Sequence, residues 1–345
     1  MHSHFAHESG GPGSDHVGLQ FRNGRIQKLL SNPPLQTEEA SEWDDASPSN
    51  LPSVDASATS CADTRCDVVY ALFLEPDDKT HPEWSWGEYM IDKAIRWGQP
   101  SPTFIHCELL IPPVPTDEGS RTQFSTYYGR KSAWQADHVD GFGYYLVQHA
   151  HRWRAVPVFA NDAANRARRE ANMELGVNYS LSRYVTSVPP FRSIARYLVP
   201  MGRRKPAHCA TLLARVLRNS FPEGDLNETA AYYGPATLHK EIQKHAGDVA
   251  LRSATLQCDA GAASTFDSTE ESIHTLLRKP MCRKHVVELG DDGCMEVVRA
   301  LTLRVTDAIV AGDSKSQCQT QKQLATALLR WNILRDPLFD QLESV

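Results

Sequence analysis

The sequence carries an imidazole in a setting where it could do chemistry. His106 lies in FIHCELLI, residues 104–111, an apolar run of the kind that forms a buried strand. Period-two alternation places His106 and Glu108 on one face of this strand, and the other face carries Ile105, Cys107, Leu109 and Ile111. A polar pair on an otherwise apolar strand needs an explanation, and a side chain that takes up and returns protons is one.

Cys209 is the candidate nucleophile that such an imidazole would serve. It lies in the first turn of HCATLLARVLRNSF, residues 208–221, whose large apolar side chains share one face of a predicted helix. The basic run at residues 203–205 comes just before it. A helix N-terminus and nearby cations both favour the thiolate, the reactive form of cysteine. Each residue alone is more typical of core packing, but His106 and Cys209 together predict nucleophilic catalysis with a thiol and a base.

Several further elements must position this pair. Apolar runs with β-branched and aromatic residues predict strands, and apolar residues three and four apart predict helices. The order along the chain predicts a small α+β domain at residues 66–250, in which a small antiparallel sheet packs on the helix that bears Cys209. The additional elements are strands at residues 68–74, 123–129, 143–148 and 153–159, and helices at residues 83–98 and 162–175.

The C-terminal part, residues 251–345, is expected to be a linker followed by a helical extension. Ser, Ala and Thr dominate residues 253–270. Apolar residues at helical spacing predict one helix at residues 294–310 and a second at 319–334, which ends before Asp336-Pro337. Two amphipathic helices joined by a short turn are typical of an antiparallel hairpin.

Residues 1–65 form a low-complexity tail with one apolar segment. The stretch at residues 37–64 is rich in Ser, Pro, Ala and acidic residues and cannot bury enough apolar surface to order itself. Residues 16–30 differ, because alternating apolar residues ahead of Asn23-Gly24 favour a hairpin, while a short helix would suit the later ones equally. This segment is either a flexible leader or a docking site for a protein partner, formed by Val17, Leu19, Phe21, Ile26, Leu29 and Leu30.

Composition and motifs exclude several classes of function. The net charge of -6 argues against general nucleic-acid binding, and no apolar run is long enough for a transmembrane segment. The first residues lack the features of a secretory signal, so we expect a cytoplasmic protein. No cofactor is predicted, because no phosphate-binding or dinucleotide-binding glycine loop is present. No metal is predicted either, since Cys258, Cys282, His285 and Cys294 match no common zinc spacing.

Five segments together resemble the circularly permuted papain-like thiol hydrolases of the NlpC type, whose relatives include the lecithin–retinol acyltransferases. In that group the strand with the histidine precedes the helix with the cysteine, as FIHCELLIP precedes AHCATLLARVL about 100 residues later. The other segments are the lead-in strand VVYALFL, the Tyr-containing loop NYSLSRY and the proline-then-helix segment YYGPATLHKEI, residues 232–242. The resemblance covers roughly residues 66–245, about half the chain.

The resemblance implies a role for each candidate residue. Cys209 would be the nucleophile, His106 the base, and the backbone N–H of Cys209 an oxyanion donor. A third, polar residue would orient the imidazole, and Gln123, Ser125 and Glu108 are the alternatives. The expected activity is hydrolysis or acyl transfer on an amide or ester, with an acyl or peptide substrate. The alternative is a catalytically idle papain-like fold that serves as a structural or interaction component of a larger assembly.

Overall fold

The computed structural model describes residues 19–22, 25–28, 67–76, 102–113, 123–126, 131–134, 149–180, 182, 205–221, 234–256, 266–279 and 282–335. Near the N-terminus, β1 (Leu19–Arg22) and β2 (Arg25–Lys28) pair antiparallel across Asn23-Gly24, so of the two forms expected for residues 16–30 the chain adopts the hairpin. The predicted helix at residues 83–98 and the predicted strand at residues 143–148 lie outside the described residues.

A five-stranded antiparallel sheet organises the described part of the chain, with strand order β6-β5-β4-β3-β7. Its members are β3 (Asp67–Leu74), β4 (His106–Leu110), β5 (Gln123–Ser125), β6 (Ala133–Trp134) and β7 (Trp153–Ala160). Four of them confirm strands predicted from apolar runs, while β6 is a two-residue strand that no run marks. The central strands β3 and β4 are almost fully buried, which explains why their sequences read as continuous apolar runs.

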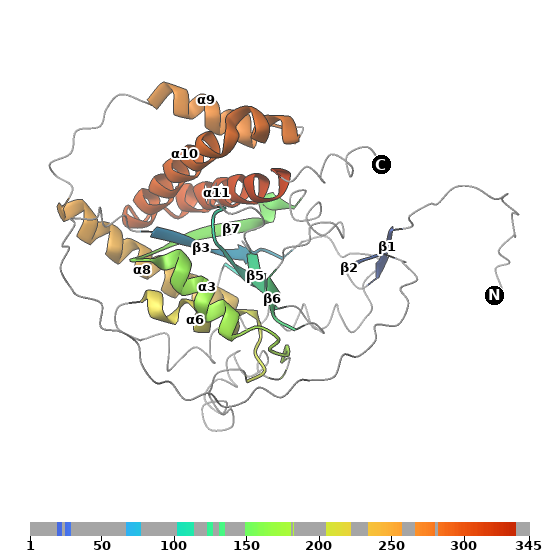
Figure 1. Cartoon of the computed structure of the whole chain (residues 1–345). Helices are drawn as coiled ribbons and strands as arrows, with labels where there is room; N and C mark the ends of the chain where they lie inside the picture. Colours follow the sequence, from blue (N-terminus) through green and yellow to red (C-terminus); the bar gives the residue numbers. More distant parts are fainter. Residues whose placement is uncertain are drawn as a thin grey trace, which may run out of the picture.

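One face of the sheet is covered by α3 (Ala163–Met173), α6 (Cys209–Leu217) and α8 (Pro235–Leu256), with the short η3 (Arg218–Ser220) continuing α6 (Figure 1). The first two confirm predicted helices, and α8 begins at the proline of YYGPATLHKEI. A single apolar cluster joins these helices to alternate residues of β3, β4 and β7, among them Phe73, Leu109 and Val156. Because α8 runs to Leu256, it extends into the stretch predicted as a linker.

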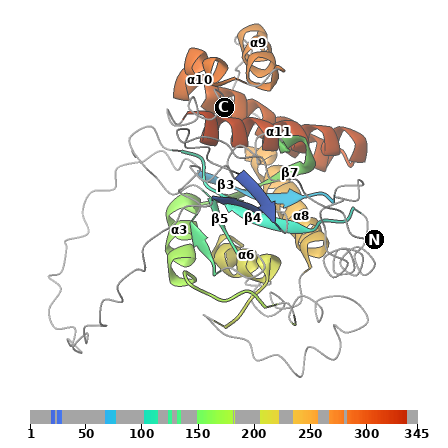
Figure 2. The ribbon, with the colours of Figure 1, turned by 90° about the vertical axis from the view of Figure 1, so that its right-hand side faces the viewer.

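The opposite face is covered by α10 (Arg283–Val310) and α11 (Ser314–Leu334), and α9 (Phe266–Leu277) packs on these two helices from outside (Figure 2). The two predicted helices are confirmed, but α10 starts earlier and changes direction at Gly290, whose φ is 66°. The sequence did not predict α9. These helices share a second apolar cluster with the sheet, so the C-terminal segment completes the fold by burying the other sides of β3 and β7.

The molecule is therefore an α+β protein in which a small antiparallel sheet packs against the helix that bears Cys209, as expected. Within the described residues, no helix combines the length and the apolar character needed to cross a membrane.

His239 on α8 is a buried polar residue that links the fold to acid stability. Its ring packs against Phe73 and Phe104, and only 1% of its surface is exposed. Burial, assisted by the charge of Arg154, lowers the pKa of His239 to about 3. In the unfolded chain His239 binds a proton near pH 6.5, whereas in the folded chain it does so only near pH 3. Stability is therefore lost as the pH falls through this window.

We expect replacement of His239 with Phe to flatten the acid limb of the stability profile. In the wild type, the free energy of unfolding lost through His239 is of the order of 4 kcal/mol across this pH window, at about 1.4 kcal/mol per pKa unit. Urea unfolding at a series of pH values measures it, with His274→Gln, an exposed histidine of α9, as the control. An acid limb that is equally steep in His239→Phe and in the wild type would contradict the assignment.

Candidate active site

The backbone just before α6 fixes the position of Cys209. His208 is the N-cap residue in an extended conformation, and its carbonyl accepts a hydrogen bond from the N–H of Leu212 at 2.9 Å. Ala207 pairs with the segment at residues 178–180, since its N–H donates to the carbonyl of Asn178 at 3.0 Å and its carbonyl accepts from Ser180 at 3.1 Å. These bonds hold the start of the helix against the rest of the domain, so Cys209 at its first position has a defined place.

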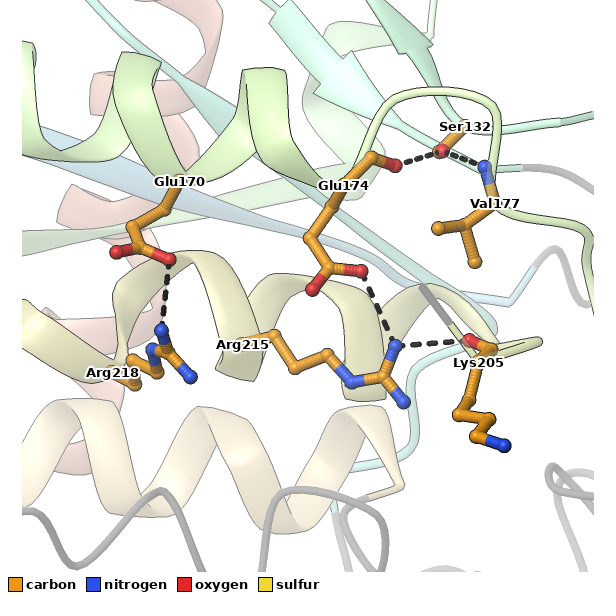
Figure 3. Close-up of polar contacts among 7 residues, drawn as sticks. All are labelled: Ser132, Glu170, Glu174, Val177, Lys205, Arg215 and Arg218. Carbon is orange, nitrogen blue, oxygen red and sulfur yellow. Dashed lines mark hydrogen bonds and ion pairs between the residues drawn. The ribbon is translucent and has the colours of Figure 1, made fainter. Parts of the chain in front are cut away.

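Two ion pairs with buried carboxylates hold α6 and the adjoining η3 against α3. Arg215 donates to the carboxylate of Glu174 at 3.3 Å and to the carbonyl of Lys205, in the turn before α6, at 3.0 Å (Figure 3). One turn away, Arg218 lies 3.3 Å from the carboxylate of Glu170. Both carboxylates are at least nine-tenths buried. We call these four side chains the α3–α6 clamp: Glu170, Glu174, Arg215 and Arg218.

Ser132 connects this clamp to the edge of the sheet. Its hydroxyl donates to the carbonyl of Glu174 and accepts from the N–H of Val177 at 2.8 Å (Figure 3). The carbonyl of Ser132 accepts from Gly176, whose positive φ of 76° lets the chain turn back after α3. Through these bonds, the end of α3, the residues before β6 and the start of α6 form one connected support for Cys209.

His106 is held in place by polar and aromatic neighbours. Its Nε2 lies 3.2 Å from Oε1 of Glu108 and 3.0 Å from the hydroxyl of Ser125, which also donates to the carbonyl of Cys107 at 3.4 Å. The ring of Trp153 meets the imidazole edge-on, with centroids 6.1 Å apart. His106 is 8% exposed and Glu108 is 1% exposed, so this network is shielded from water.

The structure brings Cys209 and His106 together. Within the described residues, β5 pairs with β4 at Leu109 and Leu110. His106 lies at the start of β4, before these pairs, and here the side chains of His106 and Cys209 hydrogen-bond. Burial works to lower the pKa of His106, but the charge of Cys209 and the hydrogen bonds to Cys209 and Glu108 raise that pKa to about 9. At neutral pH the imidazole is therefore positively charged.

The pKa of Cys209 moves in the opposite direction, well below its ordinary value. A hydrogen bond from Cys107 lowers it most, burial opposes the shift, and the charge of His106 with hydrogen bonds to His106 and His208 lowers it further. Burial raises the pKa of Cys107, and the neighbouring Cys209 and Glu108 add to this rise. The pair thus consists of a Cys209 thiolate and a His106 imidazolium, with Cys107 as a neutral donor.

Alternation along β4 follows the prediction with one exception. Cys107, Leu109 and Ile111 lie in the apolar cluster on the α6 face, whereas His106, at the first position of the strand, contacts both Glu108 and Cys209. Ile105 was predicted to share a face with Cys107, and this is wrong, because Ile105 precedes the strand at a bend and packs against the opposite cluster. Regular alternation therefore begins at His106.

Of the three candidates for the orienting residue, the structure brings Glu108 and Ser125 to the imidazole and not Gln123. Gln123 pairs with Leu110, four residues along β4 from His106. It is fully buried, and both polar atoms of its amide lack a hydrogen-bond partner within the described residues. The register of β5 against β4 therefore keeps Gln123 away from the imidazole.

The sequence did not indicate Cys107 and His208 as partners of Cys209, nor the α3–α6 clamp. Cys107 was assigned to the apolar face, and that placement is what brings it to Cys209. The sequence does contain a sign of the clamp. Glu170 and Glu174 are four residues apart, on the face of α3 that also bears Ala163, Ala167 and Ala171. A carboxylate on an apolar helix face indicates a buried cation partner.

Access to Cys209 is narrow. Its side chain is 2% exposed, whereas Cys282 and Cys318 are half-buried. Burial raises the pKa of Cys294 to about 12. In the part of the chain that the structure describes, no group of three or more His, Cys, Asp or Glu side chains is arranged to hold a metal ion.

Comparison with known proteins found no match: no family model fits the chain, and no curated protein or solved structure is significantly similar to it. The resemblance to the permuted papain-like hydrolases therefore depends on the short motifs, and it stays a prediction.

Proposed function

We propose that this protein is a thiol hydrolase or acyltransferase that acts on an amide or ester through an acyl-Cys209 intermediate, on a permuted papain-like fold. The observation that supports this best is the buried, hydrogen-bonded Cys209–His106 pair, in which the pKa of the thiol falls and that of the imidazole rises to about 9. A core cysteine without such a partner has its pKa raised by burial, as Cys294 does. Shifts in opposite directions are what a nucleophile and its acid–base partner need.

In the proposed reaction, the Cys209 thiolate attacks the carbonyl carbon, a C–S bond forms, and the carbonyl oxygen becomes negatively charged. As this intermediate collapses, the C–N or C–O bond breaks and the leaving group takes the proton from the His106 imidazolium. Water then attacks the thioester and gives its proton to His106, the C–S bond breaks, and the acid leaves. In acyl transfer an amine or alcohol replaces water.

Neighbouring groups have defined tasks in this scheme. Glu108 and Ser125 contact Nε2 of His106, and the carboxylate of Glu108 stabilises the imidazolium while His106 exchanges its proton. The N–H of Cys209 is at the first position of α6, where the helix provides no acceptor, so it can donate to the oxyanion. The basic run at residues 203–205 would suit a substrate with a carboxylate or phosphate; of these, Lys205 is described and exposed.

An activated acyl ester offered to the native protein tests the proposal. We expect one acyl group per chain, located on Cys209 by peptide mass mapping, and lost in Cys209→Ala. Cys318→Ala is the matched control, because Cys318 is the more exposed thiol and should not affect the labelling. Acylation that falls on Cys318 or Cys282 instead of Cys209 would rule the proposal out.

A second candidate is a catalytically idle papain-like fold within a larger assembly, and the burial of Cys209 favours it, because a nucleophile that is 2% exposed needs a local opening to meet its substrate. If the activated ester acylates Cys209 only after the protein is unfolded, this second candidate is favoured.

The partner would dock on the N-terminal segment, a large apolar cluster beyond an acidic spacer. Deleting residues 1–35 is expected to leave the melting temperature of the isolated protein nearly unchanged while releasing it from its assembly in cell extracts. A fall of several degrees, with association unaffected, would show that the segment belongs to the domain itself.

A further inference from the structure

A cavity of about 730 Å³ lies far from α6, between α11, the end of α9 and the short helix η2 (Ala150–Arg152). This volume is within the range that holds small organic ligands in proteins, roughly 300–1,000 Å³. Among the described residues, five basic side chains line it and no carboxylate does, so its walls carry an unusual positive charge. The five are His151, Lys279, Lys315, Lys322 and Arg330. We call this cavity the basic pocket.

Arg330 is the buried cation of the basic pocket. It is 5% exposed, and its Nη1 donates to the carbonyls of Leu276 at 2.6 Å and Arg278 at 3.0 Å, at the end of α9. Its Nε has no hydrogen-bond partner, and no carboxylate pairs with it within the described residues. Carbonyl dipoles compensate a buried cation only in part. Arg330 therefore gives the cavity a positive charge that a bound anion would neutralise.

The lysines around the pocket differ in their partners. Lys322 lies 2.6 Å from the carboxylate of Glu75, which Arg154 also contacts, so one carboxylate serves two cations. Lys279 and Lys315 are exposed and have no ion-pair partner within the described part of the chain. Like charges gathered around one cavity raise each other's free energy, and a bound anion relieves this.

We propose that the basic pocket binds a small organic oxyanion, a carboxylate or phosphate ester carried on a short apolar body. The oxyanion lies against Arg330 and is closed in by Lys279 and Lys315, while Leu277 and Ala150 provide apolar contact for the body of the ligand. Gln319 and Gln323 add neutral hydrogen-bonding groups. This inference does not depend on the proposed chemistry at Cys209, since the two sites share no residue.

Calorimetric titration at constant ionic strength tests the proposal with three probes: octanoate, phenyl phosphate and the neutral octanamide. We expect saturable binding of octanoate or phenyl phosphate and none of octanamide, and the anion that binds more tightly identifies the carboxylate or the phosphate class. Binding should weaken by about tenfold in Lys279→Gln/Lys315→Gln, because two ion pairs with exposed lysines are lost.

The matched control is Lys240→Gln/Lys284→Gln, two exposed lysines on α8 and α10 that do not line the pocket. It makes the same change in net charge and should bind as the wild type does. Because all four lysines are exposed, both variants should fold, so the result does not depend on replacing Arg330. The proposal is overturned if neither anion binds, if octanamide binds equally well, or if the two double variants bind alike.

Discussion

Replacing His106 with Ala is expected to slow the alkylation of Cys209 by about tenfold at pH 6, and more at lower pH. Without the imidazolium, the thiol returns toward an ordinary pKa of about 8.5, so only about one molecule in 300 carries the thiolate at pH 6. The more basic thiolate is the stronger nucleophile, and this recovers part of the difference. The clearest sign is the shape of the rate profile, flat through neutral pH in the wild type and rising with pH in the variant.

Iodoacetamide labelling followed by peptide mass spectrometry measures these rates for each cysteine separately. Cys318 provides the internal control, since it lies outside the network and its rate should be the same in both proteins. Cys107→Ala should shift the profile in the same direction, because the hydrogen bond from Cys107 is the largest influence that lowers the pKa of Cys209. Identical profiles for wild type and His106→Ala would show that the two residues do not form an ion pair.

The ion pair has a less obvious effect on stability. Between pH 6.5 and about 8.5 the unfolded chain holds one proton on the Cys209 thiol, and the folded chain holds one on His106. Taken alone, the raised pKa of His106 would reduce stability as the pH rises, and the lowered pKa of Cys209 would increase it. The two terms cancel, so the pair adds no slope in this window. Ultraviolet absorbance of the thiolate, rather than a stability profile, detects the pair.

Replacing Glu174 with Gln is expected to lower the free energy of unfolding by about 3–5 kcal/mol, the usual cost of leaving one member of a buried ion pair without its partner. Glu174 is 3% exposed, and after the change Arg215 would keep only uncharged acceptors, the carbonyl of Lys205 and the amide oxygen of the new side chain. Since Arg215 ties α3 to the turn before α6, the loss should also increase local opening around Cys209. Urea denaturation measures the first effect and hydrogen exchange the second.

Glu270→Gln is the matched control for this prediction. Glu270 pairs with Arg304, but both side chains are more than a third exposed, so the change should cost less than about 1 kcal/mol. The double variant Glu174→Gln/Arg215→Met should recover part of the loss, because it also removes the uncompensated cation. Equal losses from Glu174→Gln and Glu270→Gln would show that the α3–α6 clamp contributes no more than a surface pair.

Strands with a continuous apolar run and helices with an apolar face were predictable from the sequence. The runs that became β3, β4 and β7 are apolar because the sheet is covered on both sides, and α6 reads as a helix because its apolar residues share a face. The helix α9 was missed because Ile273, Leu276 and Leu277 are its few apolar anchors in a polar stretch. The break in α10 depends on Gly290, which a sequence pattern does not distinguish from a helix stop.

The site was predictable only in its two main residues. Cys209 and His106 could be named because their types and local settings suit the chemistry, and the order of the segments connects them. The choice among Glu108, Ser125 and Gln123 needed the register of β5 against β4, which places Ser125 beside the imidazole and Gln123 opposite Leu110. The clamp needed the packing of α3 on α6, a contact between segments more than 40 residues apart.

The helices that cover one face of the sheet come last in the chain, and this has a consequence for biosynthesis. When the ribosome has made β7, α6 and α8, every strand of the sheet exists, but Tyr70, Leu72 and Leu110 still face water until α10 and α11 emerge. A nascent chain at this stage exposes a broad apolar surface, which attracts chaperones or other chains. Translation that stalls near residue 280 should therefore release an aggregation-prone product, whereas the completed chain buries the same surface.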